Sequence, residues 1–176
     1  MTHANRSLRG ARPRRVLAAT RWAFVAALAL AMPPFARGDE TECRGTLSGA
    51  VTGRFRCSVA LEVAGDGKTY FVLTARESID RVPSYAPGAF EVPDPVTPAT
   101  YTLDTLGMGR ASVALEGGAL YTATKTSSQR GEVTLALRSV RRARPAGAYT
   151  VHGTYRARLV PAGAGKRGEV VVEVTF

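Results

Sequence analysis

The sequence predicts an all-β protein, an antiparallel β-sandwich of about eight or nine strands, with a closed β-barrel as the alternative. Three observations lead to this expectation. Apolar and polar residues alternate with a period of two over most of the chain after residue 42. Turn signals, among them Asp66-Gly67 and Gly117-Gly118, separate the alternating segments. No segment after residue 38 repeats apolar residues with the 3.6-residue period of an amphipathic helix.

Residues 1–38 have the layout of a signal peptide. They hold seven arginines and no acidic residue, and the apolar run 23–32 is followed by Pro33-Pro34. About ten apolar residues are too few for a bilayer span, which needs about 20. We therefore expect cleavage after Gly38, export to the periplasm or the medium, and no stable membrane span afterwards. The leader accounts for most of the net charge of +10, because residues 39–176 hold 17 basic and 14 acidic residues.

The first two strands of the remaining single domain, 39–176, carry both cysteines of the chain. In 43–51 and 55–63 the apolar residues occupy odd positions, which include Cys43 and Cys57. A hairpin centred on Ala50 pairs the two cysteines and keeps the apolar faces together. In an oxidising compartment we expect them to form a buried disulfide that closes a loop of about 15 residues.

The middle of the chain predicts five more strands, at 69–76, 99–104, 110–116, 120–126 and 132–140. Residues 77–98, between the first two, contain five prolines, which lack the N–H that a central strand needs. We therefore predict a Pro-rich loop over 77–98. Its aromatic residues, Tyr85 and Phe90, either pack down to fix the loop or form a contact surface.

The last two strands, 149–160 and 169–176, match opposite charges. Pairing Val160 with Glu169 places Arg156 opposite Glu173, and a slip of two residues places Arg158 opposite Glu169. Either register is favourable, because opposite charges that face each other across strands attract. We expect this hairpin to be part of the core, since the alternating valines of the final strand need a buried face.

No residue pattern nominates a catalytic site. His152, the one histidine after residue 38, lies on the polar face of its strand, and no motif gives it a nucleophile or a carboxylate. The chain has neither G-x-S-x-G nor H-E-x-x-H, and 165–168 lacks the full phosphate-loop pattern. We expect a non-enzymatic protein without catalytic residues, cofactor or metal. A hydrolase with a site assembled from loops stays an alternative.

The main basic cluster of the domain comprises Arg138, Arg141, Arg142 and Arg144. Arginines at a strand end suit an anionic partner, such as an envelope polysaccharide or phospholipid headgroups, or protect the strand edge from aggregation. No aromatic residues alternate with them, so we do not expect a nucleic-acid partner. With Tyr85 and Phe90, these arginines are the expected binding surface.

Residues 43–57, 149–154 and 170–176 resemble the corresponding runs of small, uncharacterised exported β-rich proteins of GC-rich bacteria. The resemblance covers the two ends of the domain and implies an extracytoplasmic β-fold, but it carries over no catalytic or binding residue. We expect a structural or binding role at the bacterial cell envelope, with an anionic component or another envelope protein as partner. A β-barrel that binds a small apolar ligand is the second hypothesis.

Overall fold

The structure, a computed structural model, describes residues 40–76, 79, 82, 84–126, 130–143, 147–163 and 168–176. These residues form ten strands and no helix, which confirms the all-β class, and each of the nine expected segments contains a strand. The predicted signal peptide and Arg144 lie outside the described residues. The strands are β1 (Thr41–Gly49), β2 (Gly53–Val63), β3 (Thr69–Ala75), β4 (Ser84–Val92), β5 (Thr100–Thr102), β6 (Gly109–Ala114), β7 (Leu120–Thr124), β8 (Glu132–Arg142), β9 (Ala148–Pro161) and β10 (Val170–Thr175).

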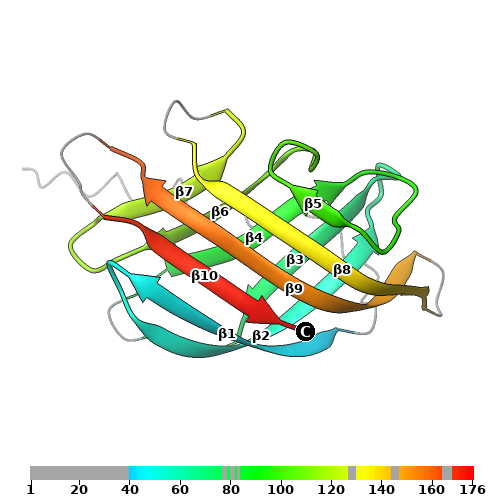
Figure 1. The fold of residues 1–176 in the computed structure, drawn as a ribbon, viewed down its shortest axis with the longest axis horizontal. Helices are drawn as coiled ribbons and strands as arrows, with labels where there is room; N and C mark the ends of the chain where they lie inside the picture. Colours follow the sequence, from blue (N-terminus) through cyan, green and yellow to red (C-terminus); the bar gives the residue numbers. More distant parts are fainter. Residues whose placement is uncertain are drawn as a thin grey trace, which may run out of the picture. The chain divides into compact units, whose positions relative to one another are not determined.

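The sheet closes into an eight-stranded barrel in the order β10-β1-β2-β3-β4-β6-β7-β9, and β9 returns to β10. This is the architecture expected as the alternative, in place of the two-sheet sandwich. Closure depends on the 14 residues of β9, which pair with β8 and β7 along one edge and with β2 and β10 along the other. Strands β8 and β5 continue the sheet from β9, and Figure 1 shows β10, β9 and β8 side by side in front of β4 and β6.

Both terminal hairpins have registers that the sequence predicts. Cys43 faces Cys57 across β1 and β2, and Arg156 faces Glu173 across β9 and β10. The predicted turn between β6 and β7 is also present, and Gly117 and its neighbour have φ angles of 83° and 79°. Two successive positive φ angles are what a tight hairpin turn requires, and glycine adopts them without steric cost.

Strand β4 lies inside the segment predicted as a Pro-rich loop, so that prediction is wrong for residues 84–92. Pro87 fits into β4 because the ladder between β4 and β6 shifts register between Ala86 and Ala89. At such a bulge, a residue without an N–H interrupts no regular pair. The proline pattern therefore marks an irregular strand here and not a loop.

Aromatic side chains fill the centre of the barrel. The ring of Phe71 stacks on Tyr155 at a centroid distance of 5.5 Å and lies 5.8 Å from the ring of Phe176. The Tyr155 hydroxyl donates a 2.6 Å hydrogen bond to the carbonyl of Pro87. Burial raises the pKa of Tyr155 far above its usual value, so the phenol stays neutral and keeps donating. These contacts join β3, β4 and β9 through the core.

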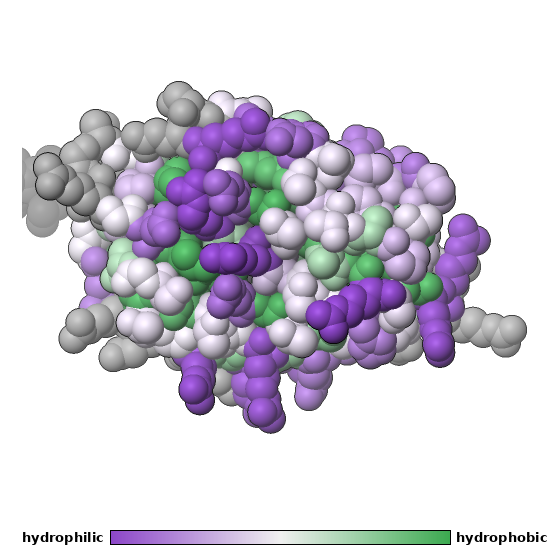
Figure 2. Space-filling model, in the orientation of Figure 1, coloured by the Kyte–Doolittle hydropathy of each residue, from purple (hydrophilic) through white to green (hydrophobic). Residues whose placement is uncertain are grey.

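Ion pairs cross the outer face of β8, β9 and β10. The Arg158 guanidinium lies 2.6 Å from Glu132 and 3.2 Å from Glu169, and Arg156 lies 3.3 Å from Glu173. Hydrogen bonds to the two carboxylates raise the pKa of Arg158, and the hydrogen bond from Arg158, together with its charge, lowers the pKa of Glu132. Water screens these exposed pairs, so they fix the strand register more than they add stability. Figure 2 shows polar side chains across the visible face, with apolar residues in separate patches.

Candidate functional site

A hollow of about 480 Å³ opens at one end of the barrel, where β2 ends and β3 begins. The end of β8, the start of β9 and the connection between β4 and β5 complete its wall. We call it the mouth hollow, since the ends of barrels are common places for ligands. Its lining residues are Val63, Thr69, Asp94, Pro95, Val96, Val140, Arg142 and Tyr149.

The mouth hollow combines one unmatched cation with apolar walls. Arg142 stands opposite Tyr149 in the ladder of β8 and β9, is exposed, and forms no ion pair within the described part of the chain. The buried Thr69 hydroxyl donates a 3.4 Å hydrogen bond to Asp94, so that carboxylate has a partner. Val63 is 36% exposed and presents apolar surface to the hollow.

Three of the predicted arginines, Arg138, Arg141 and Arg142, form what we call the β8 arginine edge. All three are exposed, and among the described residues none has an acidic partner. Strand β5 pairs with β8 only at Thr134–Ala136, so no strand in the described part of the chain covers this edge beyond Leu137. The ladder to β9 shifts register between Leu137 and Ser139, which makes Arg138 the extra residue of a bulge.

The bulge separates the arginines between two faces. After it, Arg141 pairs with Thr150 on the outer face, whereas Arg142 pairs with Tyr149 and lines the mouth hollow. The alternation of the sequence could not show that Arg141 and Arg142 face these two sides, because one inserted residue exchanges the faces of all the strand residues that follow it.

The two aromatic residues of the predicted contact surface take part in packing. Phe90 is 0% exposed and faces Phe71 across β3 and β4, so its assignment to a contact surface is wrong. Tyr85 is half-buried, and its ring meets that of Phe55 edge to face at a centroid distance of 5.9 Å. The bulge between Ala86 and Ala89 places both aromatic residues on the same inward face, since Tyr85 stands opposite Val113 and Phe90 opposite Gly109, and this explains the correction for Phe90.

His152 is exposed and pairs with Ser139 in the ladder of β8 and β9. Within the described residues it has no carboxylate in an ion pair or hydrogen bond that could orient it as a general base. The same residues contain no group of three or more side chains arranged to hold a metal ion.

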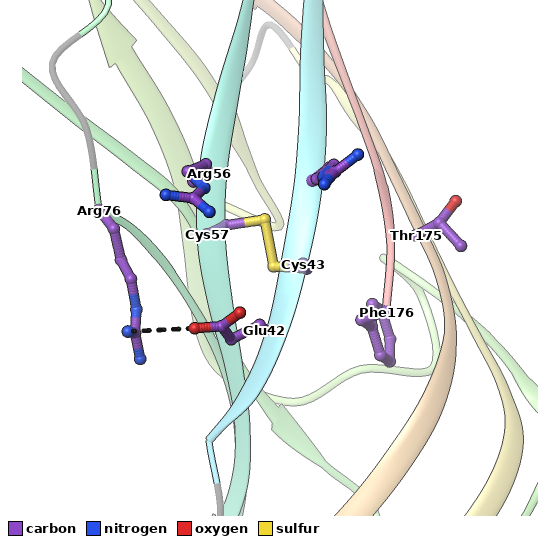
Figure 3. Close-up of a pocket in the computed structure, with 8 residues that line it drawn as sticks. Glu42, Cys43, Arg56, Cys57, Arg76, Thr175 and Phe176 are labelled. Atoms are coloured by element: carbon purple, nitrogen blue, oxygen red, sulfur yellow. Dashed lines mark ion pairs between the residues drawn. A yellow bond between two sulfur atoms is a disulfide. The ribbon is translucent and has the colours of Figure 1, made fainter.

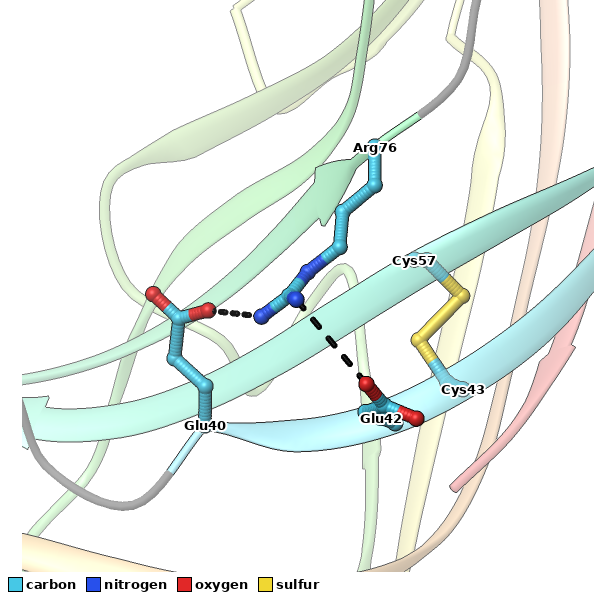
Figure 4. Close-up of a disulfide and its surroundings, with 5 residues drawn as sticks. All are labelled: Glu40, Glu42, Cys43, Cys57 and Arg76. Atoms are coloured by element: carbon cyan, nitrogen blue, oxygen red, sulfur yellow. Dashed lines mark hydrogen bonds and ion pairs between the residues drawn. A yellow bond between two sulfur atoms is a disulfide. The ribbon is translucent and has the colours of Figure 1, made fainter.

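A second hollow, about 790 Å³, lies over the β1–β2 hairpin beside the disulfide, and Figure 3 shows the residues around it. Cys43 and Cys57 are bonded, with Cα atoms 4.9 Å apart, and both are buried, which confirms the expected pair. Arg76 forms an ion pair with Glu40 and lies 3.9 Å from Glu42, as drawn in Figure 4. Arg76 already has two carboxylates close to it, and the two sulfur atoms are bonded to each other, so we base no proposal on this hollow.

The hairpin also places two like charges together, since Arg44 stands directly opposite Arg56. This pair was not predicted, although the register that joins the cysteines implies it. Like charges that face each other across strands are unfavourable. The pair lines the same hollow as the disulfide.

No helix in the described ranges is long and apolar enough to cross a membrane. Comparison with known proteins adds no relative: no family model, no curated protein and no solved structure matches the chain.

Proposed function

We propose that this chain is an exported, non-enzymatic barrel protein that binds an anionic polysaccharide of the bacterial cell envelope. The observation that carries the proposal is the outward part of the β8 arginine edge, where Arg138 and Arg141 are exposed at an uncovered strand edge without acidic partners in the described residues. At the other end of β8, by contrast, Arg158 has two carboxylates as partners. Unmatched arginines at one end suit repeated carboxylate or phosphate groups, which they bind in bidentate fashion.

A polysaccharide fits this surface better than a lipid bilayer does. Among the described residues, the large apolar side chains with substantial exposure are Val63, Met108 and Leu120. Met108 and Leu120 belong to the region of β6 and β7, and Val63 faces the mouth hollow. The outward-facing Arg138 and Arg141 thus offer charge without any of these three apolar side chains on their face to enter a membrane.

Export is supported by the disulfide and by the signal-like composition of residues 1–38. The test is the intact mass of the protein recovered from the bacterial periplasm or medium, with and without reductant. We expect a chain that begins near residue 39 and has no free thiol before reduction. An uncleaved chain with two free thiols would contradict export.

The binding test uses alginate, a polymer of uronic acids, with isothermal titration at two salt concentrations. The double variant R138Q/R141Q should bind at least about tenfold more weakly, since one charge-assisted hydrogen bond alone contributes about that factor. Its binding should also depend less on salt. The matched control is R54Q/R110Q, which removes two exposed arginines on β2 and β6 and should bind alginate like the unmodified protein.

Two results would refute the polysaccharide proposal. One is an equal loss of alginate binding in both double variants, which would mean that alginate responds to the net charge of the protein and not to these two arginines. The other is binding to phosphatidylglycerol vesicles without binding to alginate, which would assign the surface to membranes. Phosphatidylcholine vesicles serve as the uncharged reference.

A further inference from the structure

We propose that the mouth hollow binds a single-chain amphiphile that carries one anionic head group. The head group pairs with Arg142, and the apolar chain lies against Val63, Val96 and Val140. This site is separate from polysaccharide binding on the outer face and does not depend on it.

The size of the hollow suits a small ligand. Its volume of about 480 Å³ falls within the range of about 300–1,000 Å³ that is usual for small-molecule sites. The wall combines apolar surface with a few polar groups, the composition that such sites share. Deeper ligand entry into the barrel is opposed by the packed rings of Phe71, Tyr155 and Phe176, so the ligand stays at the mouth.

Arg142 is the group in the mouth hollow that suits an anion. Arg142 faces the hollow without an ion pair in the described part of the chain, and the opposite residue, Tyr149, brings a hydroxyl that can donate to the same oxygen atoms. Asp94 also lines the hollow and accepts a 3.4 Å hydrogen bond from the Thr69 hydroxyl. Arg142, beside the Tyr149 hydroxyl, is therefore the group that we assign to the anionic head, and D94N tests how far the charge of Asp94 opposes it.

The apolar walls favour a chain over a simple anion. Val63 is 36% exposed at the end of β2, although the other inward residues of this strand are buried. Val96 and Val140 pack against the edge of the core and are partly exposed. Covering this surface with a hydrocarbon chain removes apolar area from water, which is favourable.

The experiment compares decanoate, decanol and decyltrimethylammonium, each below its micelle concentration, with the purified disulfide-bonded protein. Decanoate should bind most tightly, and its affinity should exceed that of hexanoate by more than about tenfold, since each fully buried methylene contributes up to about fourfold. Amide chemical shifts should change at Val63 and Tyr149 when decanoate is added. Preferential binding of the cation would overturn the proposal, because Asp94 would then govern the site.

Three variants test the head-group assignment. R142Q should weaken decanoate binding by about tenfold and leave decanol binding unchanged, whereas R142K should retain part of the affinity. D94N should strengthen decanoate binding by up to about fivefold, because it removes a like charge. R110Q, which changes net charge equally at an exposed site on β6, is the control.

Equal decanoate affinity in R142Q and R110Q would refute the assignment, and so would the absence of decanoate binding at millimolar concentration. Thermal melting of each variant shows whether it is folded, and R142K keeps the test valid if R142Q is unstable. If the unmodified protein binds decanoate but not alginate, only the polysaccharide proposal is refuted; if it binds alginate but not decanoate, only this one is.

Discussion

Removal of the disulfide should destabilise the whole barrel and not only its first hairpin. The bond joins residues 14 positions apart, and in the chain-entropy model a closed loop of this size stabilises the folded state by roughly 3 kcal/mol. Strand β1 also pairs with β10, so the hairpin cannot separate without disrupting the ring of the barrel. The bond restricts the unfolded chain, and we therefore expect its full effect on the free energy of unfolding of the whole barrel.

The test is the double variant C43A/C57A, studied by urea denaturation and by thermal melting. We expect the free energy of unfolding to fall by about 3 kcal/mol and the melting temperature to fall by about 10 °C for a domain of this size. Alanine is the suitable replacement because both cysteines are buried, and serine would place a hydroxyl in the core.

Reductant provides the matched control. It should lower the melting temperature of the unmodified protein close to that of C43A/C57A and leave the variant unchanged. The reasoning fails if the variant loses less than about 1 kcal/mol, which would mean that the unfolded chain stays compact near the hairpin. It also fails if full reduction, verified by thiol titration, leaves the melting temperature of the unmodified protein where it was.

Three further outcomes are expected. Burial raises the pKa of Glu62 above its ordinary value of 4.5, so the folded protein loses stability as the pH rises above that value. By urea denaturation, E62Q should be more stable than the unmodified protein at pH 7 and equally stable at pH 3. Y155F should cost about 1–3 kcal/mol in the same assay, because a buried β4 carbonyl loses its donor. A Cβ at Gly45 would lie 2.2 Å from the ring of Phe55, so G45A should lower the melting temperature, whereas G65A, with open space around it, should not.

Local pattern was sufficient to predict the hairpins. Alternation around Cys43 and Cys57 places both on the apolar face, and only one register keeps these faces together while it joins the sulfurs. Matching of opposite charges limits the last hairpin to two registers, and the structure has the one that places Arg156 opposite Glu173. These features could be predicted because each depends on residues close in the sequence.

Closure of the sheet could not be predicted in this way. Alternation shows that one face of each strand is buried, which holds for both a sandwich and a barrel. The deciding feature is that β9 pairs with four other strands, and pairing over such distances leaves no local pattern. Strand β4 was missed for a related reason, since Pro87 breaks the alternation at a bulge whose existence depends on the position of β6.

The bulge at Arg138 connects the two binding proposals. Without an inserted residue, the inward positions of β8 would continue as odd numbers, from Leu135 and Leu137 onwards. The register shift reverses this parity, so that Val140 and Arg142 face the mouth hollow and Arg141 lies opposite Thr150 on the outer face. A run of arginines that reads as one patch thus becomes two sites with different surroundings: Arg142 lies beside the valines of the mouth hollow, whereas Arg141 lies on the outer face. A small anionic amphiphile and a polyanion suit these two environments respectively, because only the first site offers apolar surface beside its charge.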